Sequence, residues 1–280
     1  MTSTRRPDVR RPTIGVFDSG VGGLTVLRAL LDCIPDADYL YFGDTARLPY
    51  GSKSAATVGH YAVGAVRYLQ DEGAEFLVIA CNTATALAFD EIRAASQVEV
   101  IGVVEPGAHA AASASRSRNV VVIGTEATIA SHAYRRALEA RNVAVKEKAC
   151  PLFVPLVEEG WTDHPVTEQV ARIYLGEAFA AEARSADVLV LGCTHYPLIK
   201  PLLRRLVRQE VAIVDSADST AQAVAERLQI APIHSPAETE RRAQPRLKFF
   251  ATDSAEKFKR MGTRFLGHPV ENVVHVDLKE

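Results

Sequence analysis

Short runs rich in Val, Ile and Leu alternate along this chain with longer, alanine-rich amphipathic stretches. Each run has the length and composition of a buried strand, and the stretches between runs are long enough for crossover helices. This alternation is typical of βαβ units, in which helices cover a mostly parallel sheet, so we predict an α/β fold. The expected strands are Thr13–Asp18, Asp38–Gly43, Glu75–Ala80, Val98–Val103, Val120–Gly124, Val143–Lys146, Asp187–Gly192, Val211–Asp215 and Leu247–Ala251.

These strands are too many for one small sheet, so we expect two similar α/β domains. The segment 104–117, which contains a Glu-Pro-Gly turn signal and a run of Ala and Ser, is one candidate crossing, and a second follows Arg208. We therefore predict a first domain of residues 1–103 plus 211–280 and a second domain inserted as residues 104–210. An active site is then expected in the interdomain cleft, because pockets are common between domains.

The composition excludes several classes of partner. Of the residues, 48% are apolar and 24% are charged, and the formal net charge is −2, which predicts neither a nucleic-acid nor a membrane surface. No apolar stretch approaches the roughly 20 residues that span a bilayer, and no apolar core follows the basic N-terminus, so we predict a cytoplasmic protein. Residues 1–11 are expected to form a mobile tail, and residues 231–246, with three prolines, an exposed connection.

The four cysteines do not form a C-x-x-C pair, so neither a disulfide framework nor a zinc site is expected. Cys33 and Cys150 have no polar neighbours that suggest chemistry, and we interpret them as small buried apolar residues. A Cys-x-His metal site at Cys193 and His195 would need further ligands at suitable spacing, and the nearby sequence has none. We therefore predict four free thiols and no bound metal.

Two of the cysteines occupy matching positions in the chain. Cys81 follows an apolar strand and precedes Asn82 and Thr83, and Cys193 follows another strand and precedes Thr194 and then a histidine. Ligands of open α/β sheets bind beyond the carboxyl ends of strands, so the two thiols would reach one substrate from opposite sides. A thiol at a helix N-terminus, near hydroxyl and imidazole groups, can have a lowered pKa and serve as a base. Two facing thiols indicate proton transfer.

Other loops that follow expected strands also offer hydrogen-bond donors. The Gly-rich turn 18–23 leads into a helix whose amino-terminal amides suit a carboxylate, although its glycines lack the spacing of a dinucleotide-binding loop. The Pro-Tyr-Gly loop 47–51 and the hydroxyl-rich start 124–128 have similar positions. Each of the three is also typical of an ordinary turn or helix cap, and both interpretations stay open from the residues alone.

Six segments, in order along the chain, resemble the glutamate racemase family among the aspartate/glutamate racemases. The resemblance implies two α/β domains, usually paired as a homodimer, that interconvert L- and D-glutamate without pyridoxal phosphate or a metal. It also implies a role in supplying D-glutamate for peptidoglycan. The segments are Ile14–Leu30, Tyr41–Ser54, Ile79–Ala88, Val122–Ile129, Pro151–Gly160 and Leu191–Leu203.

The same resemblance implies roles for individual residues. Cys81 and Cys193 match the acid–base pair, and Asp44 and Glu158 match auxiliary acidic positions, with Glu159 as an alternative to Glu158. The implied catalytic residues are Cys81, Cys193, His195, Asp18 and Glu158. The implied substrate-binding residues are Asp18, Ser19, Asp44, Tyr50, Gly51, Asn82, Thr83, Thr125, Thr194 and His195.

Our mechanistic hypothesis is that Cys81 takes the α-proton of D-glutamate and that Cys193, helped by His195, takes that of L-glutamate. Three alternatives remain. An aspartate racemase would share the two thiols and differ in the size of its pocket. A cysteine-nucleophile amidohydrolase would need only one of the thiols, and a non-catalytic ligand-binding protein would need neither.

Overall fold

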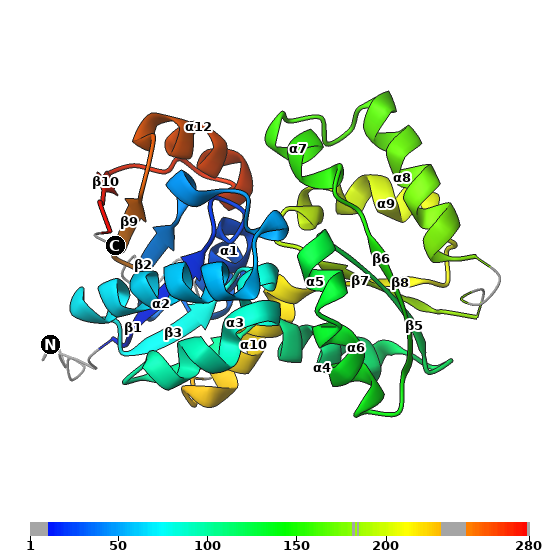
Figure 1. Cartoon of the computed structure of the whole chain (residues 1–280), viewed down its shortest axis with the longest axis horizontal. Coiled ribbons are helices and arrows are strands. Elements are labelled where there is room, and N and C mark those ends of the chain that lie inside the picture. The colour runs from blue at the N-terminus through cyan, green and yellow to red at the C-terminus, as the bar shows by residue number, and fades with distance from the viewer. Residues whose placement is uncertain (1–10, 181–182, 184, 231–244, 279–280) are drawn as a thin grey trace, which may run out of the picture.

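The computed structural model describes residues 11–180, 183, 185–230 and 245–278. Two parallel sheets lie side by side, each flanked by helices, which confirms the predicted fold class (Figure 1). The first sheet has six strands in the order β10-β9-β2-β1-β3-β4, and the second has four in the order β6-β5-β7-β8. Residues 1–10 of the expected tail and residues 231–244 of the expected connection lie outside the described residues.

The first sheet is built around its central strands, whose side chains are almost all buried. Burial on both faces explains why these strands are continuously apolar rather than alternating. β10 is the one strand of this sheet that was not predicted, because three residues at an edge carry too little pattern. The strands are β1 (Thr13–Asp18), β2 (Asp38–Gly43), β3 (Phe76–Ile79), β4 (Glu99–Gly102), β9 (Leu247–Ala251) and β10 (Val273–His275).

The second sheet corrects one predicted domain boundary. The strand expected at Val211–Asp215 was assigned to the first domain, but β8 pairs with β7 in parallel and so belongs to the second sheet. The predicted end of the second domain at residue 210 is therefore wrong, since the second sheet continues to Asp215. The strands are β5 (Asn119–Gly124), β6 (Ala144–Ala149), β7 (Val188–Gly192) and β8 (Ala212–Asp215).

Helices cover both sheets. Beside the first sheet lie α1 (Leu24–Cys33), α2 (Ala55–Asp71), α3 (Asn82–Ala95) and α12 (Ala255–Leu266). Beside the second lie α4 (Val104–Ala114), α5 (Glu126–Ala130), α6 (Ala133–Glu139), α7 (Phe153–Glu158), α8 (Pro165–Ala178) and α9 (Lys200–Leu206). The helix α10 (Ser216–Arg227) packs against both α1 and α4 and so joins the two halves. No helix within the described ranges is long and apolar enough to cross a membrane.

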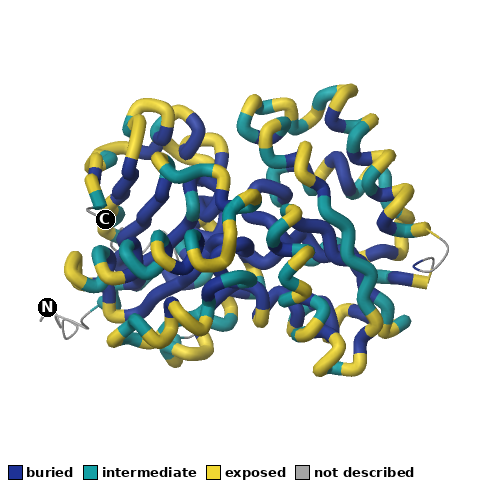
Figure 2. The backbone as a smooth tube through the Cα atoms, in the orientation of Figure 1, coloured by how far each residue is buried: buried dark blue, intermediate teal, exposed yellow. Residues whose placement is uncertain are grey.

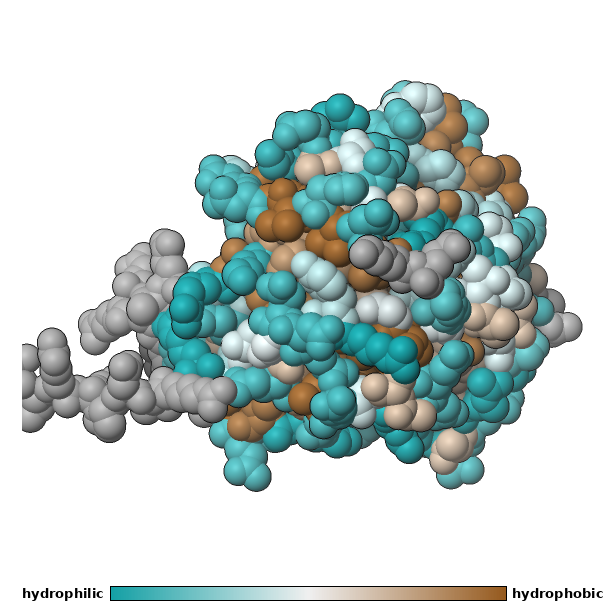
Figure 3. Space-filling model, turned by 60° about the vertical axis from the view of Figure 1, so that its left-hand side comes forward, coloured by the Kyte–Doolittle hydropathy of each residue, from teal (hydrophilic) through white to brown (hydrophobic). Residues whose placement is uncertain are grey.

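The apolar core holds the two halves in one arrangement. Buried strands run through the centre of each half in Figure 2. One continuous cluster of buried side chains includes Leu24 of α1 and Phe258 of α12 together with Phe153 of α7 and Leu191 of β7. By contrast, the face shown in Figure 3 is mostly hydrophilic, with apolar side chains in separate patches. Because the core is shared, loops at the carboxyl ends of both sheets are held in fixed positions relative to each other.

Candidate active site

A cavity of about 450 Å³ lies among the loops that follow the strands of both sheets. Ser19 and Cys81 reach it from the first half, and Thr125 and Cys193 reach it from the second. The two thiols that the sequence singled out therefore face one cavity. The predicted site residues that line it are Ser19, Tyr50, Gly51, Cys81, Asn82, Thr83, Thr125, Glu158, Cys193, Thr194 and His195.

Cys81 is the amino-terminal cap of α3. Its Sγ accepts a hydrogen bond from the Ala84 amide at 3.4 Å, and its thiol donates to Ser19 Oγ at 3.5 Å. Burial, and to a lesser extent the nearby charge of Asp18, raise the pKa of Cys81 to about 12, and these hydrogen bonds only partly oppose the shift. The expected lowering of this pKa is therefore wrong, because loss of hydration outweighs the helix terminus. Cys81 rests as a thiol and is suited to donating a proton.

Asp18 lies behind the cavity and does not line it, although the sequence predicted a substrate contact. Its Oδ2 accepts a hydrogen bond from the Gly20 amide at 2.9 Å. Its other carboxyl oxygen, Oδ1, is buried and has no hydrogen-bond partner among the described residues. Burial raises the pKa of Asp18, while the charge of His195 and the turn amides lower it in part. The role that the geometry supports for Asp18 is to hold the turn that carries Ser19.

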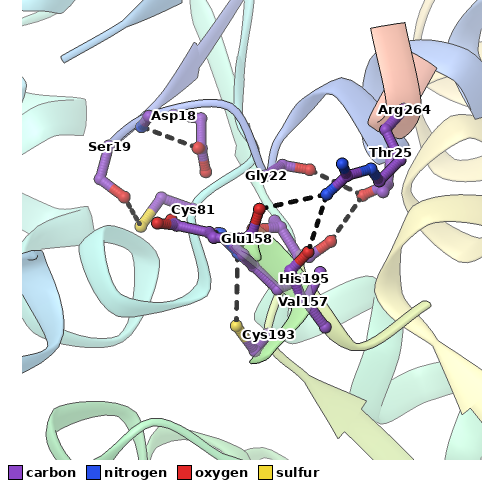
Figure 4. Close-up of polar contacts among 12 residues, drawn as sticks. Asp18, Ser19, Gly22, Thr25, Cys81, Val157, Glu158, Cys193, His195 and Arg264 are labelled. Atoms are coloured by element: carbon purple, nitrogen blue, oxygen red, sulfur yellow. Dashed lines mark hydrogen bonds and ion pairs between the residues drawn. The ribbon is translucent and has the colours of Figure 1, made fainter. Parts of the chain in front are cut away.

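Cys193, His195 and Glu158 form a chain of contacts on the opposite side of the cavity (Figure 4). The imidazole Nδ1 lies 3.9 Å from Cys193 Sγ and 3.4 Å from Thr194 Oγ1, and Nε2 lies 3.1 Å from Glu158 Oε1. Burial disfavours the charged imidazole, but the contacts with Cys193 and Glu158 outweigh it and raise the pKa of His195 to about 10. Of the two adjacent glutamates, Glu158 is the one that contacts the histidine.

The raised pKa of His195 predicts a pH dependence of stability. Protonated His195 stabilises the fold fully below its unfolded pKa of about 6.5, and this contribution is lost as the pH rises through its folded pKa. That folded pKa is about 10. We expect the free energy of unfolding of the wild type to fall more between pH 7 and pH 10 than that of His195→Gln. Urea unfolding at both pH values measures it, and parallel losses in the two proteins would contradict the charged pair.

Asp44, which the sequence resemblance marks as a substrate-binding residue, also lies outside the cavity lining. It is fully buried, and its Oδ2 accepts a hydrogen bond from the Tyr50 hydroxyl at 2.6 Å. Thr252 Oγ1 and Arg47 Nη1 donate to its Oδ1 at 2.8 and 3.0 Å. Asp44 thus fixes the ring of Tyr50, which does line the cavity.

Hydroxyl and amide groups connect the two halves at the cavity floor. Thr83 Oγ1 of α3 lies 3.0 Å from Thr125 Oγ1, and both lie within hydrogen-bond distance of Thr128 Oγ1. Asn82 Oδ1 accepts a hydrogen bond from the Tyr134 hydroxyl at 2.7 Å. These polar groups of the first half are therefore positioned by partners in the second half. Thr128 belongs to a segment that the sequence flagged, but its contact with Thr83 was not foreseen.

Several lining residues were missed from the sequence, and Lys257 of α12 is the most distant from any motif. The others are Leu48, Pro49, Ser52, Glu126, Pro151, Val154 and Pro155. All four cysteines are free thiols; Cys150 is buried as expected, whereas Cys33 is only partly buried. Within the described part of the chain, no group of three or more His, Cys, Asp or Glu side chains is arranged to hold a metal ion.

Comparison with known proteins agrees with this geometry. Residues 23–224 match the Asp/Glu/Hydantoin racemase family. The chain is 62% identical to the glutamate racemase of Koribacter versatilis (strain Ellin345), over 96% of this chain and 98% of that relative. It is 46% identical to the glutamate racemase of Geobacter metallireducens, over 95% of this chain and 97% of that relative.

A solved structure shows the same arrangement over nearly the whole chain. The crystal structure of glutamate racemase from Francisella tularensis subsp. tularensis SCHU S4, in complex with D-glutamate, superimposes with a TM-score of 0.84 at 34% identity. The match covers 96% of this chain and 98% of that one. The chain therefore belongs to the Asp/Glu/Hydantoin racemase family and is a racemase, an isomerase, as the sequence resemblance implied.

Proposed function

We propose that this protein interconverts L- and D-glutamate by proton transfer between two thiols, without pyridoxal phosphate or a metal. The observation that carries the proposal is the placement of Cys81 and Cys193 in the walls of one cavity, on loops from different halves. A two-base racemase needs one group on each face of the α-carbon, and this arrangement supplies both. The choice of glutamate is supported by relatives that bear the name glutamate racemase at up to 62% identity.

The proposed reaction balances one proton removed against one proton added. With L-glutamate bound, the thiolate of Cys193 takes the α-proton and becomes a thiol. The thiol of Cys81 then gives its proton to the opposite face of the carbanion and becomes a thiolate. D-glutamate reacts in the reverse direction, so each turnover leaves the enzyme ready for the opposite enantiomer. The raised pKa of Cys81 supports its role as the first donor.

The α-hydrogen is a very weak acid, so the cavity must stabilise the negative charge that develops when it leaves. A preorganised hydrogen-bond donor is typically worth about 3 kcal/mol in such a transition state. The candidate donors are the side chains of Ser19, Asn82, Thr83 and Thr194 and the backbone amides around Tyr50 and Gly51. Protonated His195 adds a positive charge beside Cys193, which supports the thiolate as the base on that side.

Other parts of the proposal follow from the family resemblance. We propose that the product D-glutamate enters peptidoglycan synthesis, that the protein is cytoplasmic, and that it works as a homodimer. The relatives' shared name supports glutamate as the substrate, and the metabolic role rests on the family resemblance. The net charge of −2 supports the expectation that neither nucleic acid nor a membrane is a partner.

The decisive experiment is solvent-deuterium incorporation at Cα of L-glutamate, D-glutamate, L-aspartate and D-aspartate by purified protein without added cofactor. We expect exchange and inversion with both glutamate enantiomers only. Exchange confined to aspartate would move the substrate assignment to aspartate. The absence of exchange with all four amino acids would overturn the proposed reaction and would favour a hydrolase or ligand-binding function at the same cavity.

A further inference from the structure

The helix α7, which carries Glu158, has an unusual carboxyl end. Two backbone bonds close it: the Trp161 amide donates to Leu156 O, and the Gly160 amide donates to Val157 O, both at 2.9 Å. Gly160 has φ +83°, the left-handed conformation that this type of helix end requires. Neither of these bonds reaches the carbonyl of Glu158, the residue that contacts His195. These two bonds therefore leave the Glu158 carbonyl, at the end of α7, without a cap.

Arg264 from α12, in the other half of the molecule, caps this end. Its Nη1 donates to Glu158 O at 3.1 Å and to Val157 O at 3.3 Å (Figure 4). A cation is also favoured at the negative end of the helix. A Cβ placed on Gly160 would lie 2.9 Å from the guanidinium, so a glycine at that position is what allows the arginine to approach.

The next residue of α12, Phe265, contacts the Cys193–His195–Glu158 group at a second point. The ring of Phe265 meets the His195 ring edge-on, with centroids 5.0 Å apart and planes at 77°. α12 itself is anchored in the first half, where Phe258 packs against Tyr41. Two consecutive residues of the first half therefore hold the Glu158 and His195 contacts that serve Cys193 in the second.

We infer that Arg264 is a positioning residue for proton transfer at Cys193: by capping α7 it holds Glu158, and through Glu158 it holds His195, against the Cys193 thiol. The expected effect of Arg264 on catalysis rests on the proposed two-thiol racemisation. Its expected effect on structure is a change in the environment of Cys193 but not of Cys81, and this effect does not depend on that proposal. The side of the site that the second half provides is thus completed by a residue of the first half.

The test compares Arg264→Met, which removes every donor but keeps an apolar stem, with the matched control Arg260→Met on the exposed face of the same helix. The first readout is the rate of alkylation by iodoacetamide, measured for each cysteine by peptide mapping. We expect the ratio of Cys193 to Cys81 alkylation to fall about threefold in Arg264→Met, because His195 no longer stabilises the thiolate. Arg260→Met should leave the ratio unchanged. An unchanged ratio in Arg264→Met would overturn the inference, whether or not the protein racemises glutamate.

The second readout is the α-deuterium isotope effect on kcat/KM. In Arg264→Met, kcat should fall about tenfold, and the isotope effect should rise with L-[2-²H]glutamate and fall with D-[2-²H]glutamate. This asymmetry arises because only the transfer at Cys193 is slowed. Gly160→Ala should reproduce this asymmetry by displacing the guanidinium, and Arg264→Lys should partly restore the wild-type isotope effects. Equal changes with both enantiomers would indicate general loosening and would also overturn the inference. A wild type without racemase activity would overturn the proposed function alone.

Discussion

Replacing Cys193 with alanine is expected to lower the rate of glutamate racemisation about 1000-fold or more, because acid–base groups contribute roughly 100- to 10,000-fold. The loss should not be uniform across the partial reactions. Cys81 remains able to take the α-proton of D-glutamate and to return a solvent-derived one to the same face. Cys193→Ala should therefore still exchange the α-proton of D-glutamate with solvent deuterium while exchange from L-glutamate is lost. Proton NMR of each enantiomer in D₂O measures both rates.

The mirror variant and a control make the assignment specific. Cys81→Ala should exchange L-glutamate and lose exchange from D-glutamate. Cys33→Ala should behave like the wild type, because this thiol lies at the end of α1 and does not line the cavity. If Cys193→Ala exchanged L-glutamate at the normal rate, the assignment of the two thiols to the two enantiomers would be wrong.

The parts of the fold that the sequence predicts well are those in which local pattern and tertiary environment agree. β1 and β2 have the predicted bounds, because a mainly apolar run in each is flanked by polar or glycine residues at both ends. β8 was found as a strand but assigned to the wrong domain. The local sequence pattern is enough to predict that a strand exists. Its pairing with β7 depends on how the connection between the strands packs, which the local pattern does not contain.

The candidate site shows the same division between local and long-range information. Cys81 and Cys193 stand out because each follows a strand and precedes hydrogen-bonding residues. Lys257 and Arg264 could not be found in this way, because α12 is amphipathic and has no motif, and only packing of distant segments brings it to the cavity. The direction of the shift in the Cys81 pKa was also missed. The sequence indicates that this thiol lies at a helix terminus, but it does not show how deeply the thiol is buried.

The position of the groups around Cys193 depends on contacts between the two halves. Thr25 of α1 illustrates this dependence, since its hydroxyl lies 3.1 Å from the backbone oxygen of Thr194 and 3.0 Å from that of Gly22. The loop that follows Cys193 is thus held against the amino-terminal turn of α1. The position of His195 relative to Cys193 is determined at this contact as well as at Glu158.

Gly22 lies at this contact, and we expect Gly22→Ala to lower kcat about 100-fold, the cost of misplacing catalytic groups by about 1 Å. A Cβ on Gly22 would lie 2.3 Å from Thr194 Oγ1 and 2.5 Å from His195 Nδ1, so the loop after Cys193 must move. Gly176→Ala in α8 is the matched control, because a Cβ there has no neighbour within 4 Å. It should keep full activity and raise the free energy of unfolding by about 0.5–1 kcal/mol.

The two glycine variants separate displacement of the catalytic loop from a general effect of adding a methyl group. Racemisation followed by circular dichroism gives kcat and KM, and urea unfolding gives the free energy of unfolding for each variant. Because the new methyl group meets Thr194 and His195 rather than the core, kcat should fall far more than stability does. Normal kcat in a folded Gly22→Ala protein would show that the loop after Cys193 can shift without cost, and the two halves would then not need this contact to align the thiol.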